Sequence, residues 1–160
     1  MKKQTALFPG SFDPITKGHQ SIVERALPMF DKIIVAVGCN TAKHSVFSLD
    51  KRIEWIKQTF AKYDKVEVVT FDSLTVDFCQ QVGAKYILRG LRNSSDFQYE
   101  RNIARINQEL AEDIETVFLM TKPDDAAISS SLVREILSFG RDVSKFIPKE
   151  ITISAEDFKK

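Results

Sequence analysis

The 160-residue chain is poor in the residues that build metal sites and disulfide-bonded scaffolds, with two cysteines and two histidines. Cys39 and Cys79 lie far apart and form no C-x-x-C pair, so neither a zinc site nor a disulfide framework is expected. Unpaired thiols suit a reducing compartment, and we expect a cytoplasmic protein. No apolar run approaches the roughly 20 residues that span a bilayer. The short run near the N-terminus is broken by Pro9-Gly10, which argues against a signal peptide.

The chain also has almost no net charge, because its positive and negative residues nearly balance. The formal net charge is +1, so no global field recruits nucleic acid or a membrane surface, and an anion site has to be local. Glycine and proline are few, while 43% of the residues are hydrophobic and 28% charged, which is typical of a folded globule. We expect a single domain over residues 1–160, with residues 148–160 as a loosely attached C-terminal tail.

Short apolar runs alternate with helical patterns along the chain. The runs predict strands at residues 5–8, 33–37, 66–71, 86–88 and 116–120. The helical patterns cover residues 19–26, 49–60, 74–82, 97–110 and 130–139. This alternation predicts an α/β fold, a single-domain, Rossmann-like, doubly wound sheet of five parallel strands. Ligands bind such sheets beyond the carboxyl ends of the strands, near the switch point, so the loops there are the candidate site.

The loop after the first strand carries the clearest phosphate signal. Gly10 allows the backbone to come close to a ligand, Ser11 offers a hydroxyl group, and the Asp-Pro pair that follows is a rigid turn. Thr-Lys-Gly-His at residues 16–19 then opens a helix, whose free N–H groups and positive dipole end favour phosphate. A lone Gly-x-His would be an ordinary turn, but strand, glycine turn, hydroxyl and His19 occur in register, which favours a phosphate site.

Later loops add cationic candidates. Lys43 follows the second strand and could reach an anion, although a lysine there is more often a solvated surface residue. Arg89 ends the fourth strand, and Arg92 follows it. Arginine is suited to bidentate phosphate contacts, but a structural ion pair with Asp96 or Glu100 would explain these residues equally well.

The last loop supports the same interpretation. Ile-Ser-Ser-Ser at residues 128–131 begins a helix, where hydroxyl groups serve as N-caps and can also bind phosphate; Arg134 lies one turn further on. The chain contains no Walker-type phosphate loop, no Gly-x-Gly-x-x-Gly and no visible nucleophile–base–orienter triad. A dinucleotide-dependent hydride enzyme is therefore disfavoured.

Taken together, these motifs resemble the nucleotidyltransferase superfamily with the T/H-x-G-H signature and, within it, the bacterial phosphopantetheine adenylyltransferases. The resemblance runs from about residue 6 to about residue 148. Its motifs are Gly-Ser-Phe-Asp-Pro at 10–14, Thr-x-Gly-His at 16–19, Arg-Gly-Leu-Arg at 89–92, Asp-Phe-x-Tyr-Glu at 96–100 and Ile-Ser-Ser-Ser at 128–131. It implies an enzyme that moves AMP from ATP to 4′-phosphopantetheine, giving dephospho-coenzyme A and pyrophosphate in the penultimate step of coenzyme A biosynthesis. It also implies Mg²⁺ as cofactor, a homohexamer and feedback inhibition by coenzyme A.

The resemblance also implies roles for single positions. The implied catalytic residues are His19, Ser11, Lys43 and Arg92. The implied ATP-binding residues are Ser11, Phe12, His19, Gly90, Leu91, Arg92, Glu100, Asp125, Ala126, Ala127, Ile128, Ser129, Ser130 and Ser131. The implied acceptor-binding residues are Ser11, Lys43, Thr75 and Arg89, and no side chain is implied as a metal ligand. The chain departs from the family at Thr75, where Met or Leu is common, and at residues 125–127, where Asp-Ala-Ala replaces a loop that often carries an aromatic residue.

Other functions stay open at this point. An enzyme of the same superfamily could use another acceptor, such as nicotinate mononucleotide or glycerol 3-phosphate. A non-catalytic nucleotide or coenzyme A sensor would keep the fold, but should have lost part of the phosphate-binding set, and this chain retains Ser11, His19 and both arginines. A nucleic-acid-binding module is disfavoured by the net charge of +1 and the absence of a basic stripe.

Overall fold

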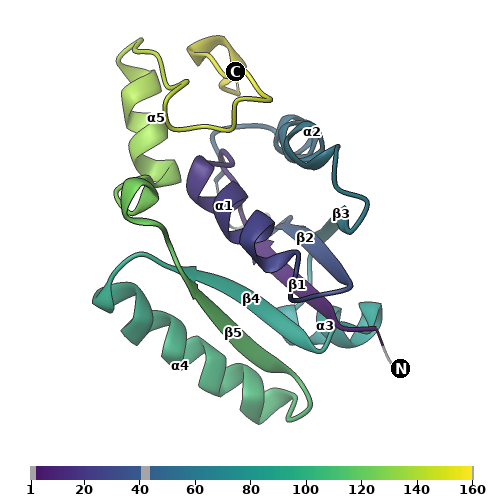
Figure 1. Ribbon diagram of the computed structural model, residues 1–160. Helices are drawn as coiled ribbons and strands as arrows, with labels where there is room; N and C mark the ends of the chain where they lie inside the picture. Colours follow the sequence, from purple (N-terminus) through teal and green to yellow (C-terminus); the bar gives the residue numbers. More distant parts are fainter. Residues whose placement is uncertain (1–2, 41–43, 160) are drawn as a thin grey trace.

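The computed structural model describes residues 3–40 and 44–159 and has a five-stranded parallel sheet at its centre (Figure 1). The strands are β1 (Thr5–Gly10), β2 (Lys32–Gly38), β3 (Val66–Phe71), β4 (Tyr86–Leu91) and β5 (Glu115–Met120). The helices are α1 (Lys17–Ala26), α2 (Leu49–Phe60), α3 (Thr75–Val82), α4 (Ser94–Leu110) and α5 (Ser130–Ser138), with short 3-10 turns η1 (Pro123–Asp125) and η2 (Ala155–Asp157). The predicted alternation of strands and helices is confirmed.

The strands lie in the order β3-β2-β1-β4-β5, which confirms the predicted doubly wound α/β sheet. The order reverses between β1 and β4, and in such sheets this switch point is where ligands bind. The pairing of β1 with β4 is short, because it joins Ala6 to Tyr86 and Leu7 to Ile87 and goes no further. β1 stays paired with β2 as far as Gly10, so β1 and β4 separate toward their carboxyl ends.

Two hydrophobic cores cover the two faces of the sheet, because side chains alternate along each strand. On one face, strand residues such as Phe8 and Val35 pack against α1, α2, α5 and the chain that follows α5. On the other face, Leu7 and Ile34 pack with α3 and with the residues that follow α4. Burying one such side chain is worth roughly 1.5–3 kcal/mol. The cores therefore hold the sheet in place and leave the loops at its carboxyl end for other roles.

Two helices begin earlier than the sequence predicts, because polar residues cap them. In α1, the hydroxyl of Thr16 accepts the N–H of His19 at 3.4 Å, and the His19 ring accepts the N–H of Thr16 at 3.1 Å. This reciprocal arrangement is a capping box, which satisfies two donors that the helix start leaves open. In α4, the side-chain oxygen of Asn93 accepts the N–H of Asp96 at 2.9 Å. The predicted N-cap of α2, Ser48, is confirmed.

The C-terminal tail, which we expected to be loosely attached, packs on the domain through two of its isoleucines. Ile151 and Ile153 are 7% and 6% exposed and belong to the core on the α1 side of the sheet. Phe158 packs against Phe47, with ring centroids 5.3 Å apart. The tail therefore covers the segment that leads into α2, as Figure 1 shows at the top of the molecule.

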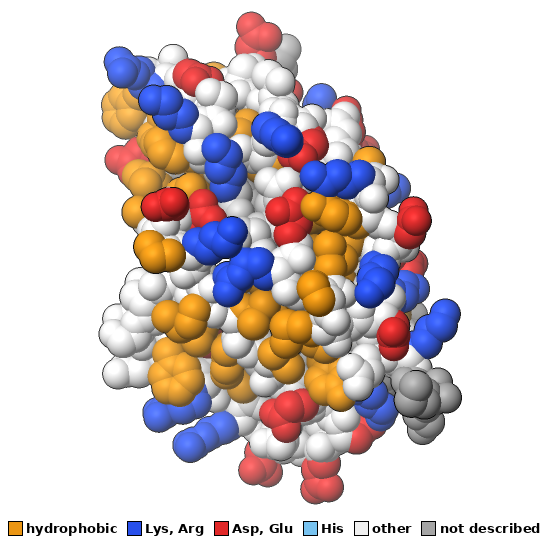
Figure 2. Space-filling view, viewed as in Figure 1, with side chains coloured by type: hydrophobic (Ala, Val, Ile, Leu, Met, Phe, Trp, Pro, Cys, Tyr) orange, Lys and Arg blue, Asp and Glu red, His pale blue; other side chains and the backbone are white. Residues whose placement is uncertain are grey.

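Some apolar surface stays uncovered around β5 and α4. Val117 and Leu119 of β5 are only half-buried on the α1 side of the sheet, and Figure 2 shows hydrophobic side chains gathered over this part of the face. Five apolar residues of α4 are between 39% and 68% exposed: Phe97, Tyr99, Ile103, Ile106 and Leu110. Within the described part of the chain, no helix is both long and apolar enough to cross a membrane.

Candidate active site

Two clefts open at the carboxyl end of the sheet, on either side of the point where β1 and β4 separate. The α1–α5 cleft has a volume of about 400 Å³ and lies between the loop after β1, the starts of α1 and α5, and the loop after β4. The β2–α4 cleft has a volume of about 1170 Å³ and lies between the ends of β1 and β2, the start of α3, and α4. Ser11 and Arg89 line both clefts, so the clefts meet at these residues.

Arg89 bridges the separated ends of β1 and β4. Its Nη1 donates to the carbonyl oxygen of Pro9 on β1 at 2.8 Å. Its Nε and Nη2 donate to the two carboxylate oxygens of Glu100 on α4, at 2.9 Å and 2.6 Å. Such a bidentate, charge-assisted pair is strong and geometrically specific. Arg89 therefore ties β1, β4 and α4 together at the junction of the two clefts.

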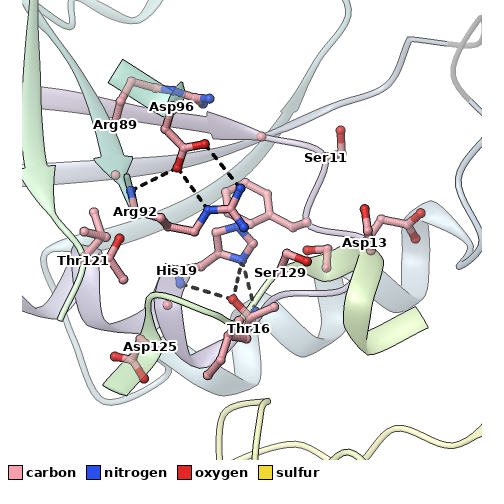
Figure 3. Close-up of a pocket in the computed structure, with 18 of the residues that line it drawn as sticks. Ser11, Asp13, Thr16, His19, Arg89, Arg92, Asp96, Thr121, Asp125 and Ser129 are labelled. Atoms are coloured by element: carbon pink, nitrogen blue, oxygen red, sulfur yellow. Dashed lines mark hydrogen bonds and ion pairs between the residues drawn. The ribbon is translucent and has the colours of Figure 1, made fainter. Parts of the chain in front are cut away.

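Arg92 makes the second ion pair of this loop. Its Nε and its backbone N–H both donate to Oδ2 of Asp96, at 3.1 Å and 3.0 Å (Figure 3). Burial raises the pKa of Asp96, but hydrogen bonds from Arg92 and the charges of Arg92 and Arg89 outweigh burial and hold the pKa below its ordinary value. Both arginines therefore have carboxylate partners, while both still line the α1–α5 cleft.

His19 stands in the first turn of α1 and faces the α1–α5 cleft (Figure 3). Its Nδ1 accepts the Thr16 N–H, so the neutral ring carries its proton on Nε2 and can donate from that atom. Burial, followed by the charges of Arg89 and Arg92, lowers the pKa of His19 to about 4. The ring is therefore neutral at pH 7 and works as a hydrogen-bond donor.

The loop after β1 is shaped by Phe12, which has a positive φ of 47°. This conformation is uncommon for a residue with a side chain and places Phe12 under Gly10. A Cβ atom on Gly10 would lie 3.0 Å from Cε2 of Phe12, so a larger residue at position 10 would collide with the ring. The Phe12 ring in turn packs edge-on against His19, with centroids 5.0 Å apart. Gly10 therefore serves to bring Phe12, and through it His19, into place.

Asp13 holds the loop after β1 in place through hydrogen bonds to other parts of the chain. Its carboxylate accepts the backbone N–H groups of Val46 and Phe47, at 2.8 Å and 3.0 Å. Its carbonyl oxygen accepts Nη1 of Arg134 on α5 at 2.7 Å. The side chain of Asp13 is 9% exposed, so these contacts are shielded from water. Asp13 thus joins the loop after β1 to the chain before α2 and to α5.

The start of α5 closes the far side of the α1–α5 cleft. Ser129 caps the helix, as predicted, by accepting the N–H of Leu132 at 3.1 Å. Ser130 donates its hydroxyl to the carbonyl oxygen of Pro14 at 2.8 Å. The helix start is thereby held against the β1 loop and lines the same cleft as the start of α1. Two helix N-termini at one cleft make a site for a highly charged anion.

Most of the predicted nucleotide-binding residues are brought together in the α1–α5 cleft. They are Ser11, Phe12, His19, Gly90, Arg92, Glu100, Asp125, Ile128, Ser129, Ser130 and Ser131. The residues that line this cleft do not include Leu91, Ala126 or Ala127; Leu91 is 6% exposed in β4, and the two alanines follow η1. Phe12 is 3% exposed, so its backbone, more than its ring, is available to a ligand.

The predicted acceptor-binding residues lie in the β2–α4 cleft where they are described. Ser11, Thr75 and Arg89 line it, and Thr75 begins α3. Lys43 lies outside the described residues, so its role stays a prediction. Sequence reasoning did not single out Arg52, which also lines this cleft and is 6% exposed. Its position in an amphipathic helix gave no signal that it points inward.

The protonation of His19 can be measured directly. We expect NMR titration of the His19 ring to give a pKa of about 4 in the ligand-free protein, and Arg92→Gln to raise it by removing a nearby positive charge. Because an unfolded histidine has a pKa of about 6.5, the unfolded state takes up its proton first as pH falls. The free energy of unfolding should therefore decrease as the pH is lowered from about 6.5 to about 4. His19→Gln should remove this part of the pH dependence, and a His19 pKa of 6.5 or above would contradict the account.

The chain matches known proteins along most of its length. A family model described as cytidylyltransferase-like matches residues 7–136. Phosphopantetheine adenylyltransferase of Cytophaga hutchinsonii is 51% identical over 91% of this chain and 97% of that protein. The corresponding proteins of Leuconostoc citreum and Porphyromonas gingivalis are 50% and 49% identical, over 91% and 93% of this chain and 92% and 97% of theirs.

Solved structures of low sequence identity share the fold. A putative nicotinate-nucleotide adenylyltransferase from Vibrio parahaemolyticus superimposes with a TM-score of 0.70 at 18% identity, over 93% of this chain and 96% of that one. A bifunctional NMN adenylyltransferase/ADP ribose pyrophosphatase from Francisella tularensis gives a TM-score of 0.67 at 15% identity, over 91% of this chain and 44% of that one. At these identities the likeness supports the sheet topology and leaves the choice of substrate to other observations.

Proposed function

The chain belongs to the phosphopantetheine adenylyltransferases of the cytidylyltransferase-like family, and on this premise we propose how its two clefts divide the reaction. The enzyme transfers the adenylyl group of ATP to 4′-phosphopantetheine, giving dephospho-coenzyme A and pyrophosphate in the penultimate step of coenzyme A biosynthesis. ATP occupies the α1–α5 cleft, and the acceptor occupies the β2–α4 cleft. The observation that carries this assignment is that the two clefts meet at Ser11 and Arg89.

On the ATP side, the starts of α1 and α5 bind the triphosphate. His19 donates from Nε2 to a phosphate oxygen, and Arg92 adds a positive charge at the edge of the same cleft. Bound phosphate favours the protonated ring, so ATP should raise the pKa of His19 from its low value in the free protein. Gly90, Glu100 and residues 125–131 form the remaining walls toward the nucleoside. In this way the site supplies donors and cations where the triphosphate carries most of its charge.

On the acceptor side, the phosphate of 4′-phosphopantetheine lies at Ser11, between the two clefts. Arg89 is held by Glu100 and Pro9, so it acts as a fixed cation and needs no rearrangement when the substrates bind. Thr75, at the start of α3, contacts the pantetheine arm further along the cleft. We assign Lys43 to the same phosphate from the family resemblance alone.

The chemistry is a direct displacement at the α-phosphorus of ATP. A phosphomonoester has a second pKa of about 6, so the acceptor phosphate is largely ionised at neutral pH and attacks without a general base. Its oxygen forms the new bond to the α-phosphorus, while the bond from that phosphorus to the pyrophosphate oxygen breaks. Catalysis then consists of positioning and of stabilising the charge that develops on pyrophosphate, the roles of Ser11, His19 and Arg92.

The site fits a magnesium ion that is held mainly by the substrate. Among residues 3–40 and 44–159, no group of three metal-ligating side chains is found. Of the four carboxylates that line the α1–α5 cleft, three are engaged: Asp13 by backbone N–H groups, Asp96 by Arg92 and Glu100 by Arg89; the fourth is Asp125. Mg²⁺ is commonly bound through substrate phosphates and water with few protein ligands. We therefore propose that the phosphates of ATP would hold Mg²⁺ in this cleft, and the ion would supply positive charge to the leaving pyrophosphate.

The direct test is pyrophosphate release with ATP, Mg²⁺ and 4′-phosphopantetheine. We expect release from this mixture and none above background when nicotinate mononucleotide or glycerol 3-phosphate replaces the acceptor, with ATP or CTP.

His19→Ala should lower kcat by about 10²–10³, the cost of losing one well-placed charge-stabilising donor, with circular dichroism unchanged. Near-wild-type turnover by a folded His19→Ala protein would contradict the site. Binding of ATP by the wild type without turnover would point to a nucleotide sensor.

We also propose that the protein assembles as a homohexamer and that coenzyme A inhibits it. The apolar residues on α4 and around β5 are exposed side by side, and exposed apolar surface of this kind commonly marks a protein–protein interaction site. α4 also lines the acceptor cleft with Tyr99 and Ile103, so an interface on this helix would border the active site. Coenzyme A shares its pantetheine arm with the acceptor and would compete for the β2–α4 cleft.

The assembly can be tested on one helix with a matched pair of variants. Ile106 is 61% exposed on the apolar stripe of α4, and Gln108 is an exposed polar residue of the same helix. We expect Ile106→Glu to convert the assembly to smaller species in light scattering after size-exclusion chromatography, because the new charge would be buried in the interface. Gln108→Glu should leave the mass unchanged. A hexamer with Ile106→Glu, or a monomeric wild type, would contradict the proposed interface.

The cysteines support a location in the cytoplasm. Cys39 and Cys79 are both unpaired. Burial raises the pKa of the Cys79 thiol to about 12, so this thiol stays protonated and unreactive. Unpaired thiols persist in a reducing compartment, where coenzyme A synthesis would also find its ATP.

A further inference from the structure

Arg52 of α2 is a buried cation that holds the backbone of the loop after β1. It is 6% exposed, and its Nη1 donates to the carbonyl oxygen of Ser11 at 2.7 Å while its Nη2 donates to Oγ of Ser45 at 3.4 Å. Within residues 3–40 and 44–159, it forms no ion pair with a carboxylate, and its Nε is buried without a hydrogen-bond partner. A buried charge and an unpaired buried donor both lower the free energy of unfolding. Proteins accept such costs mainly at functional sites, so Arg52 calls for a functional explanation.

The carbonyl group that Arg52 holds belongs to the peptide unit between Ser11 and Phe12. This peptide is trans. In a trans peptide the N–H points in the opposite direction to the C=O, so the Phe12 N–H points away from Arg52. Phe12 has a positive φ of 47° and lies in neither a strand nor a helix, so no regular ladder of hydrogen bonds sets the plane of this peptide. The hydrogen bond from Arg52 therefore fixes the direction of the Phe12 N–H.

The Phe12 N–H is available to a ligand. Among the described residues it has no hydrogen-bond acceptor. Phe12 lines the α1–α5 cleft and Arg52 lines the β2–α4 cleft, while Ser11 lines both. Because Phe12 is 3% exposed, its backbone is the part that a ligand can reach. The peptide therefore lies across the junction of the two clefts, with its carbonyl oxygen anchored and its donor group unoccupied.

The C-terminal tail supports Arg52 from the other side. Nζ of Lys159 donates at 2.9 Å to Oγ of Ser45, the same hydroxyl that accepts Nη2 of Arg52. The backbone N–H of Lys159 donates to the carbonyl oxygen of Val46 at 3.0 Å. Both contacts are made with the segment that precedes α2. The guanidinium group is therefore held between this segment and the loop after β1.

We propose that Arg52 is a positioning residue for adenylyl transfer. It orients the Ser11–Phe12 peptide so that the Phe12 N–H is aimed at a phosphate oxygen where the two substrates meet. Its charge also polarises this peptide, which makes the N–H a stronger donor. A donor that is fixed before the substrates arrive stabilises developing charge without reorganisation. Arg52 acts through the backbone and touches neither substrate, and the inference rests on the proposed function, because the phosphates are those of ATP and 4′-phosphopantetheine.

The test compares the kinetics of Arg52→Met and Arg52→Lys with a matched control on the same helix. Thr59 of α2 is 0% exposed, lines neither cleft, and donates its hydroxyl to the carbonyl oxygen of Trp55 in its own helix. Thr59→Ala therefore perturbs the helix without removing a contact to the loop after β1. For each protein we would measure Tm and, well below Tm, the kcat of pyrophosphate release and the KM of both substrates. A contact that acts in the transition state lowers kcat and kcat/KM together and leaves each KM unchanged.

We expect Arg52→Met to lower kcat about 10²-fold, the effect of misplacing reacting groups by about 1 Å, with both KM values unchanged. Arg52→Lys keeps the charge and one donor, so it should recover about tenfold of this loss, the effect of one charge-assisted hydrogen bond. Thr59→Ala should lower Tm and leave kcat at the wild-type value, because its effect is on stability alone.

Other outcomes would overturn the inference. A wild-type kcat in both Arg52 variants, or an equal loss in Thr59→Ala, would reduce Arg52 to a structural role. A rise in the KM of the acceptor alone would make Arg52 a binding contact instead. If Arg52→Met fails to fold, Arg52→Lys and Ser45→Ala still decide the question, since Ser45→Ala removes the second anchor of the guanidinium and should lower kcat at unchanged KM.

The wild type separates this inference from the proposed function. Pyrophosphate release by the wild type, together with unchanged kcat in the Arg52 variants, would overturn the positioning role and leave the proposed function standing. Absence of turnover in the wild type would overturn the proposed function, and the positioning role with it.

Discussion

The arrangement of the site depends on one interaction, the hydrogen-bonded ion pair of Arg89 with Glu100, together with the bond from Arg89 to the Pro9 carbonyl. β1 and β4 stop pairing after Leu7 and Ile87, and Arg89 spans the opening that follows. Without Arg89, Glu100 would be a buried, unpaired carboxylate, at a cost on the order of 3–5 kcal/mol. The pair therefore stabilises a separation of the strands, and both clefts need that separation in order to meet.

Electrostatics connect this opening to catalysis. The same arginines that border the clefts lower the pKa of His19, after burial, and so favour a neutral ring that donates from Nε2. The capping box with Thr16 and the contact with Phe12 hold that ring at the helix start. The cleft offers two helix N-termini, a neutral hydrogen-bond donor and paired cations. This set of groups favours the binding of an anion such as phosphate. The absence of a visible base is consistent with an acceptor that is already ionised.

The sequence predicted the fold well, because buried parallel strands give unbroken apolar runs and the loops between them carry recognisable caps. It also placed Ser11, His19 and the start of α5 at one site. It could not decide whether Arg89 pairs with Glu100 or is free for phosphate, since that depends on how α4 lies against β4. It missed the burial of Arg52 and the packing of the tail, because the partners of both, such as Ser11 and Phe47, are distant in sequence.

The central claim is that the two substrate phosphates meet directly at Ser11, with no intermediate on the protein. The most direct measurement is the stereochemistry of transfer from ATP made chiral at the α-phosphorus by sulfur and oxygen-isotope substitution. A single in-line displacement by the acceptor phosphate inverts that centre, and the account predicts inversion in dephospho-coenzyme A. Retention would mean two displacements through an adenylylated side chain, and would contradict the direct encounter of the two substrates.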